Sequence, residues 1–206
     1  RLSLTALLFV TLLGSIFSCT AEAEEDQPKL TVTAYETEIE VFEDKSLQVE
    51  ERMQIHFNVA RHGPSFGLSW IYHDRPLIPS IAQGSGDYFF HFRDFLSGKD
   101  EYRFGNPFKE HPAGTDKEYT LKYRYQWPAD EDPTGDEFYW NIINDQRPYR
   151  HESVKFKVTL PKPFKESQVD FTSGEWGSLD EGRVDWRVEG NSIVGELRGP
   201  LEPNEA

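Results

Sequence analysis

The sequence EYTLKYRYQW, residues 118–127, carries the clearest strand pattern in the chain. Aromatic and aliphatic side chains occupy every second position from Tyr119 to Trp127, and polar or charged side chains fill the positions between them. Successive side chains of a β-strand point to opposite faces of the sheet, so this alternation separates the two sets. We therefore expect a strand with one buried face and one wet face.

The same alternation recurs on both sides of this segment. Residues 35–41 and 47–57 alternate around the turn Glu43-Asp44-Lys45-Ser46, which predicts a β-hairpin. Residues 154–160 read as a further strand, residues 183–197 as a second hairpin, and residues 93–116, which are rich in Gly and Pro, as loops. No segment has the spacing of an amphipathic helix, so we predict an all-β fold, an antiparallel β-sandwich with immunoglobulin-like character.

Composition narrows the function classes. The 206 residues carry a formal net charge of −14 and 14% aromatic residues. A surface of this charge repels phosphate backbones, so nucleic acid is not an expected partner, and it also repels an anionic lipid surface. The single cysteine, Cys19, lies in the first 23 residues, which excludes a Cys-based zinc site or a Cys nucleophile in the domain.

Residues 1–23 have the pattern of a signal peptide. Arg1 precedes an almost wholly apolar run from Leu2 to Phe17, and Ala21-Glu22-Ala23 has the small-x-small pattern of a cleavage site. Lipidation at Cys19 is the alternative to cleavage after Ala23. Residues 24–29 read as a short acidic linker, and 30–206 as one extracytoplasmic domain.

The candidate interaction surface lies in the motif DEFYWN. Its members are Asp136, Glu137, Tyr139, Trp140 and Asn141. Consecutive side chains on a strand face opposite ways, so one of the two rings at 139 and 140 should face away from the core. An outward ring can stack on a sugar or anchor a protein partner. Other aromatic candidates for carbohydrate stacking are Trp70, Trp127 and Trp176.

The acidic residues before this motif offer weaker candidates. Asp130, Asp132 and Asp136 could supply hard oxygen ligands to calcium, but their spacing matches no calcium-binding loop, so we expect a solvated loop and no metal. Glu137 with one of these aspartates is the candidate pair for a glycoside hydrolase. Asp136 and Glu137 would point to opposite faces of a strand, and no nucleophile elbow or phosphate loop is present, so we predict no catalytic residues and no cofactor.

The motif DEFYWN and its surroundings resemble the extracytoplasmic N-terminal domain of the YciQ-like predicted membrane proteins, a family without an established function. The resemblance covers most of residues 30–206. It includes the hairpin at Tyr35–Phe57, the glycine-bearing loop at Gly63–Gly67, the strand ending in Leu160-Pro161 and the closing Pro200–Glu205.

The family pattern differs at two places and implies more chain. Phe138 stands where Leu is usual, and the loop at 63–72 lacks an expected Arg-x-Ile-Pro. Members continue into a transmembrane helix, so the resemblance implies that this domain is truncated before one. No run after residue 23 approaches the roughly 20 apolar residues that a bilayer span needs.

These observations predict a non-enzymatic domain on the extracytoplasmic face of a bacterial cell membrane. Its expected partner is an envelope protein or a glycan, and its membrane segments lie outside this sequence. The alternative is a secreted carbohydrate-binding or carbohydrate-active domain.

Overall fold

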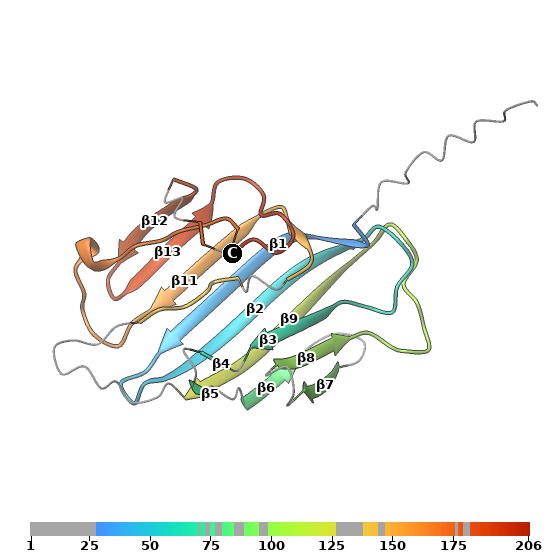
Figure 1. Ribbon diagram of the computed structural model, residues 1–206, viewed down its shortest axis with the longest axis horizontal. Coiled ribbons are helices and arrows are strands. Elements are labelled where there is room, and N and C mark those ends of the chain that lie inside the picture. The colour runs from blue at the N-terminus through green and yellow to red at the C-terminus, as the bar shows by residue number, and fades with distance from the viewer. Residues whose placement is uncertain are drawn as a thin grey trace, which may run out of the picture.

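The computed structural model describes residues 28–69, 71–72, 75–76, 80–84, 89–94, 99–126, 138–143, 147–175, 177–178 and 182–206. Within these ranges the chain forms strands and one short 3-10 helix (Figure 1). The elements are β1 (Leu30–Val41), β2 (Ser46–Phe57), β3 (Ser65–Ser69), β4 (Ile71–Tyr72), β5 (Arg75–Pro76), β6 (Ser80–Gly84), β7 (Phe89–Asp94), β8 (Lys99–Phe104), β9 (Thr115–Gln126), β10 (Arg150–His151), β11 (Val154–Thr159), η1 (Glu166–Gln168), β12 (Val184–Glu189) and β13 (Ser192–Leu197).

Three strands of 12 residues each, β1, β2 and β9, form the centre of the main sheet. The predicted hairpin is confirmed: β1 and β2 pair antiparallel, with Ile39 opposite Val49. The strand predicted around residues 118–127 is β9, which pairs antiparallel with β2. Their alternation places one apolar face inward, and the opposite face carries ion pairs such as Lys122 to Glu50 at 2.8 Å.

The order of strands in the main sheet is β12-β13-β11-β1-β2-β9-β6, and β10 also pairs with β1. The predicted hairpin at 183–197 is β12 with β13. The prediction of a purely antiparallel sheet is wrong, because β1 pairs in parallel with both β10 and β11. Alternation reports which face of a strand is buried and carries no information on the direction of its neighbour. The all-β class is confirmed, and the immunoglobulin-like sandwich stays a prediction.

A second, three-stranded sheet of order β3-β8-β7 packs on the apolar face of the main sheet. The ring of Phe104 on β8 lies 5.2 Å from that of Tyr119 on β9, and Phe66 on β3 lies 6.0 Å from Phe104. Strand β8 lies within residues 93–116, where the sequence analysis expected loops. Its six residues stand among Gly and Pro residues, which obscure so short an alternation.

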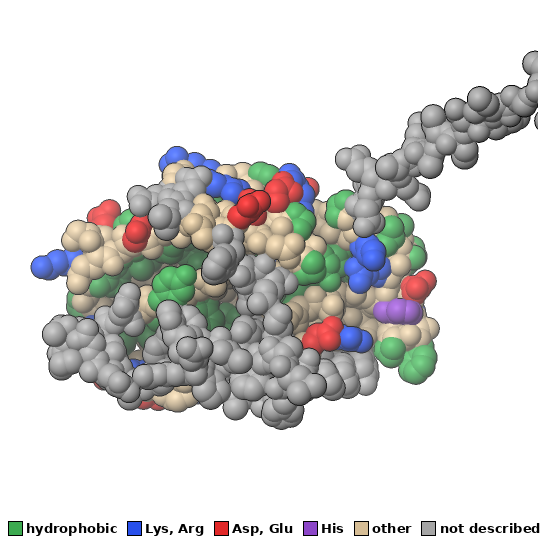
Figure 2. Space-filling model, in the orientation of Figure 1, with side chains coloured by type: hydrophobic (Ala, Val, Ile, Leu, Met, Phe, Trp, Pro, Cys, Tyr) green, Lys and Arg blue, Asp and Glu red, His purple; other side chains and the backbone are tan. Residues whose placement is uncertain are grey.

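The core lies between these sheets and the segments that cross the apolar face. On that face, Figure 2 shows hydrophobic side chains gathered in a hollow over the left half of the main sheet. The segment from Phe138 to Ile143 contributes partly buried aromatic and aliphatic side chains to this core. The apolar face is therefore where the chain places its candidate site.

Candidate functional site

Residues 138–143, here called the aromatic strap, cross the apolar face of the main sheet without forming a strand. The rings of Phe138 and Trp140 are parallel within 7°, with centroids 6.4 Å apart. Trp140 also meets Tyr125 of β9 edge-on at 5.2 Å, and the Tyr35 hydroxyl of β1 donates a hydrogen bond to the Ile142 carbonyl at 3.3 Å. The strap is thus fixed to two strands of the main sheet.

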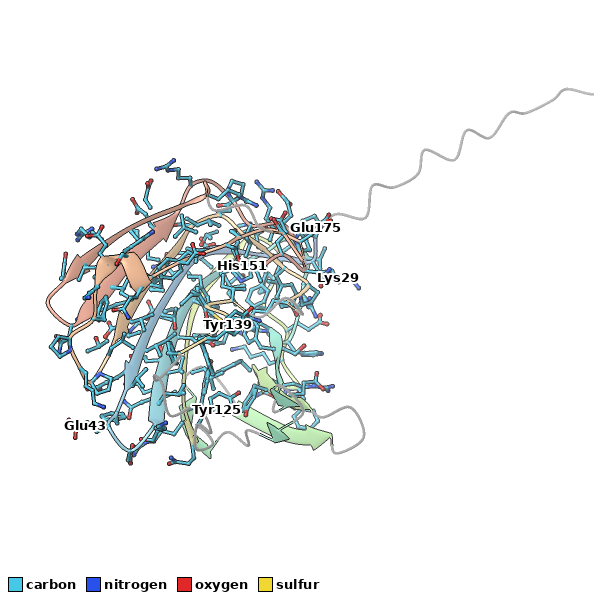
Figure 3. The ribbon with its side chains drawn as sticks, turned by 60° about the vertical axis from the view of Figure 1, so that its left-hand side comes forward. Lys29, Glu43, Tyr125, Tyr139, His151 and Glu175 are labelled. Atoms are coloured by element: carbon cyan, nitrogen blue, oxygen red, sulfur yellow. The ribbon has the colours of Figure 1, made fainter. Side chains whose placement is uncertain are left out.

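The outward ring of the strap is Tyr139. Its side chain is 56% exposed, whereas Trp140 is partly buried and Asn141 is exposed. Figure 3 shows Tyr139 over the middle of the molecule. The aromatic β segment predicted here is wrong for residues 138–143, since contacts to Tyr125 and Tyr35, rather than a strand ladder, orient the rings. The role of Tyr139, Trp140 and Asn141 in binding stays a prediction.

Several sequence candidates fall outside the described residues. These are Asp130, Asp132, Asp136, Glu137, Trp70, Trp127 and Trp176. The proposed calcium ligands and the proposed carboxylate pair therefore have no described geometry. Within the described ranges, no cluster of three His, Cys, Asp or Glu side chains could hold a metal ion.

A buried ion pair, Arg147 with Glu51, lies beside Tyr35 and was not predicted from the sequence. The Arg147 guanidinium donates to Glu51 Oε2 at 2.5 Å, and the Tyr123 hydroxyl donates to Glu51 Oε1 at 2.6 Å. The exposed fractions of the Arg147 and Glu51 side chains are 1% and 2%. The signal in the sequence was Glu51 itself, since it occupies a core position of β2 between Val49 and Met53.

Arg147 connects the layers of the molecule. Its guanidinium lies 5.2 Å from the ring centroid of Tyr35 on β1 and 5.1 Å from that of Phe66 on β3. Burial alone lowers the pKa of Arg147, but the charge of Glu51, the electrostatic effect of Tyr35 and the hydrogen bond to Glu51 together outweigh burial, so the pKa is raised. Arg147 therefore stays charged, with its positive charge shared between a carboxylate and two aromatic faces.

Burial also sets the ionisation of the neighbouring groups. It raises the pKa of Tyr123, and the charge of Glu51 adds to that effect, so the phenol stays neutral and donates to the carboxylate. His151 is 1% exposed and meets the Tyr35 ring edge-on at 5.6 Å. Burial and then the charge of Arg147 lower the pKa of His151 to about 3, against an opposing effect of the Tyr149 backbone. His151 is therefore neutral at pH 7.

This arrangement is suited to stabilising the core. Both oxygens of Glu51 are engaged by Arg147 and Tyr123, and the carboxylate has almost no exposed surface. A general acid or base must come within hydrogen-bond reach of a substrate, which the position of Glu51 does not allow. The accessible side chains of the strap include Tyr139 and Asn141.

A second, polar hollow lies near Ser173, Glu175 and Glu205. Arg183 at its edge is already engaged, since it donates to the Glu205 carboxylate at 3.2 Å and to the Pro200 carbonyl at 2.6 Å. Because Arg183 already binds Glu205 and the Pro200 carbonyl, it does not present its charge to a ligand in this hollow, and the strap remains the stronger candidate.

Solved structures with a similar arrangement include peptidases. An M1 zinc metallopeptidase from Deinococcus radiodurans is 12% identical, with a TM-score of 0.42 over 83% of this chain and 39% of that chain. Native leukotriene A4 hydrolase from Saccharomyces cerevisiae is 10% identical, with a TM-score of 0.47 over 84% of this chain and 28% of that chain. The chain thus spans less than half the length of these proteins, and likenesses this weak carry no argument about its activity.

The family comparison is more informative. No curated protein matches the sequence. Among the described residues, no helix is long and apolar enough to cross a membrane. Residues 31–193, however, match the model of the family described as "Predicted membrane protein (DUF2207) N-terminal domain". This match covers most of the chain and agrees with the resemblance identified in the sequence, and the chain therefore belongs to the DUF2207 family of membrane protein N-terminal domains, whose function is unknown.

Proposed function

We propose that this chain is a non-enzymatic interaction domain on the extracytoplasmic face of a cell membrane, which binds an envelope protein or a glycan through the aromatic strap. The signal-peptide pattern of residues 1–23 supports export, and the family description supports attachment to a membrane.

The observation that carries the proposal is the ring of Tyr139, 56% exposed on a fixed support. Phe138, before Tyr139, is partly buried against the core. After Tyr139, Trp140 packs on Tyr125 and the Tyr35 hydroxyl donates to the Ile142 carbonyl, so the residues on both sides of Tyr139 are held by the domain. A ring presented on an ordered backbone loses little conformational freedom when it binds. Tyr is also enriched at interfaces, where its apolar ring and polar hydroxyl both find partners.

The binding test compares Tyr139→Ala with Tyr139→Phe in the full-length protein. Pull-down from solubilised envelope membranes and binding to a glycan array are the two readouts. We expect Tyr139→Ala to lose binding about 30-fold or more, since anchoring aromatics contribute roughly 2 kcal/mol or more, and Tyr139→Phe to retain most of it. Wild-type levels of binding by Tyr139→Ala would remove the strap from the proposal.

The membrane test is fractionation of the full-length gene product with an alkaline wash of the membranes. Retention in the washed pellet supports an integral membrane protein. Release into the wash or the medium favours the second candidate, a secreted carbohydrate-binding domain, because the exposed ring of Tyr139 could also stack on a sugar.

A further inference from the structure

One end of the main sheet gathers the start of β1, the end of β2 and the start of β9. Leu30 pairs with Phe57, and Phe57 pairs with Thr115. Two connections meet at this end, residues 58–64 and residues 105–114, and Figure 1 shows the β8–β9 connection beside the start of β1. Arg61 and His111 join the two connections through reciprocal backbone hydrogen bonds of 3.0 and 2.6 Å.

Phe108 projects from this end with 94% of its surface exposed. The turn that carries it is closed locally: the Phe108 amide donates to the Asn106 side chain at 2.8 Å, and the Lys109 amide donates to the Asn106 carbonyl at 3.1 Å. The ring therefore points outward from a turn that hydrogen bonds hold in shape.

The base of this turn is packed against the domain. The ring of His111 stacks on Phe57 at 5.5 Å and 11°. Gly63 and Gly105 lie where the chains approach closely: a Cβ on Gly63 would lie 1.9 Å from the Phe104 carbonyl oxygen, and a Cβ on Gly105 would lie 1.6 Å from the His62 carbonyl oxygen. Phe108 is thus an apolar side chain exposed on an ordered support rather than on a loose loop.

Cationic and acidic side chains both lie around Phe108. Lys109 follows Phe108 in the sequence, and Arg61 lies on the connection of residues 58–64, which is hydrogen-bonded to the one that carries Phe108. The backbone carbonyl of Lys29 accepts a hydrogen bond from the amide of Val59, and Val59 is 39% exposed. Two carboxylates also lie at this end. Glu110 lies 3.7 Å from His62, and Asp116 lies 2.7 Å from His56.

We propose that this end of the domain contacts the surface of a lipid bilayer, with the Phe108 ring inserted among the headgroups and Lys109 and Arg61 near anionic lipids. Aromatic side chains favour the membrane interface, and each nearby Lys or Arg adds attraction to anionic lipid. Salt screens charges beyond about 8–10 Å, so the net charge of −14 acts on this contact mainly through the groups near Phe108, where Lys109, Arg61 and Lys29 accompany Glu110 and Asp116.

The path of the chain supports a bilayer as the occupant. This inference rests on the proposed membrane attachment, which the family description supports. Pro28 lies at the same end, since Asn58 donates to its carbonyl at 2.6 Å. The apolar run from Leu2 to Phe17 ends eleven residues before Pro28, a distance of at most about 40 Å for an extended chain. Phe108 lies within the domain, so the proposed contact holds with the leader either cleaved or lipidated.

The test uses the full-length protein reconstituted in phosphatidylethanolamine and phosphatidylglycerol vesicles. Phe108→Cys is labelled with an environment-sensitive fluorophore, and quenching is measured with lipids that carry a nitroxide near the headgroup. Glu43→Cys is the matched control, because Glu43 is exposed in the hairpin turn at the opposite end of the molecule (Figure 3). The twelve residues of β1 separate the two ends by roughly 35–40 Å. Unsubstituted protein controls for labelling at Cys19.

We expect nitroxide lipids to cause a loss of fluorescence at position 108 and none at position 43. Adding Lys109→Glu should reduce that loss in phosphatidylglycerol vesicles and change it less in phosphatidylcholine vesicles. Equal fluorescence at position 108 with and without nitroxide lipids would overturn the proposal. An emission shift that depends on protein concentration alone would also overturn it, because that result would assign the surface to contact with a second copy of the chain. Release of the whole protein by alkaline wash would refute the membrane attachment itself, so the two failures are distinguishable.

Discussion

Replacing Arg147 with Met should destabilise the domain by about 3–5 kcal/mol, the range found when one partner of a buried ion pair is removed. The variant leaves the Glu51 carboxylate 2% exposed and without its cation, while the Tyr123 hydroxyl still donates to it. It also removes a cation that lies about equally far from Tyr35 and Phe66, at 5.2 and 5.1 Å. For a domain of this size, the loss corresponds to a fall in Tm of roughly 6–20 °C.

Chemical denaturation of the wild type, Arg147→Met and the double variant Arg147→Met/Glu51→Leu is the assay. The double variant removes both charges, so it should recover most of the loss, since buried pairs replaced by apolar residues are often close to neutral. The exposed pair of Arg198 and Asp185, with side chains 62% and 48% exposed, is the control. Arg198→Ala should lower the free energy of unfolding by less than about 1 kcal/mol.

Two results would refute this reasoning. A loss of under about 1 kcal/mol for Arg147→Met would mean that the carboxylate finds water or another donor without disturbing the fold. A double variant less stable than Arg147→Met would mean that Glu51 contributes through Tyr123 independently of Arg147. Either outcome would remove the paired charges of Arg147 and Glu51 as a main support of the core.

The remaining predictions use the same measurements. Gly105→Ala should lower the free energy of unfolding by about 2 kcal/mol or more, because φ is +99° and the new Cβ would lie 1.6 Å from a backbone oxygen. Gly67→Ala is the control: its Cβ meets nothing within 4 Å, so it should change the free energy of unfolding by less than about 1 kcal/mol. Similar losses for the two variants would refute the steric argument. The folded-state pKa of His151 is about 3, below the unfolded value near 6.5, so its contribution to stability is complete above pH 6.5 and declines as pH falls toward 3. Relative to His151→Phe, the wild type should therefore lose about 2–3 kcal/mol between pH 7 and pH 4.5, and parallel pH profiles would contradict this. Trp140→Ala should cost about 2–4 kcal/mol by unpacking Tyr125, while Tyr139→Ala should stay within about 0.5 kcal/mol of wild type in urea unfolding; a large loss for the latter would make the exposed ring a folding element.

The sequence predicted the strands whose evidence is local. Residues 35–41, 47–57 and 118–127 have long alternations, and the hairpins of β1 with β2 and of β12 with β13 follow because neighbouring strands need only a short turn to pair. The parallel pairing of β1 with β11 joins segments more than one hundred residues apart. Alternation is the same for either direction of pairing, so no local pattern could have identified it.

The site was predictable in part, for a related reason. The expectation of one outward ring came from strand alternation, yet the strap is not a strand, and Tyr139 faces outward because Trp140 packs on Tyr125. Glu51 was visible as a charge at a core position of β2, but its partner Arg147 is 96 residues away. A buried charge predicts that a partner exists, and only the fold identifies which residue it is.

The two proposals together imply an orientation for the domain. Trp140 contacts Tyr125, which pairs with Leu47 beside the hairpin turn, so this part of the strap lies toward the end that carries Glu43 (Figure 3). Phe108 lies at the other end of the same strands. A domain that rests on lipid through Phe108 would therefore hold Trp140 roughly 30 Å above the bilayer, given about 3.3 Å per strand residue. At that height the neighbouring ring of Tyr139 faces a partner in the space outside the membrane, so a lipid-embedded partner would be incompatible with both proposals holding at once.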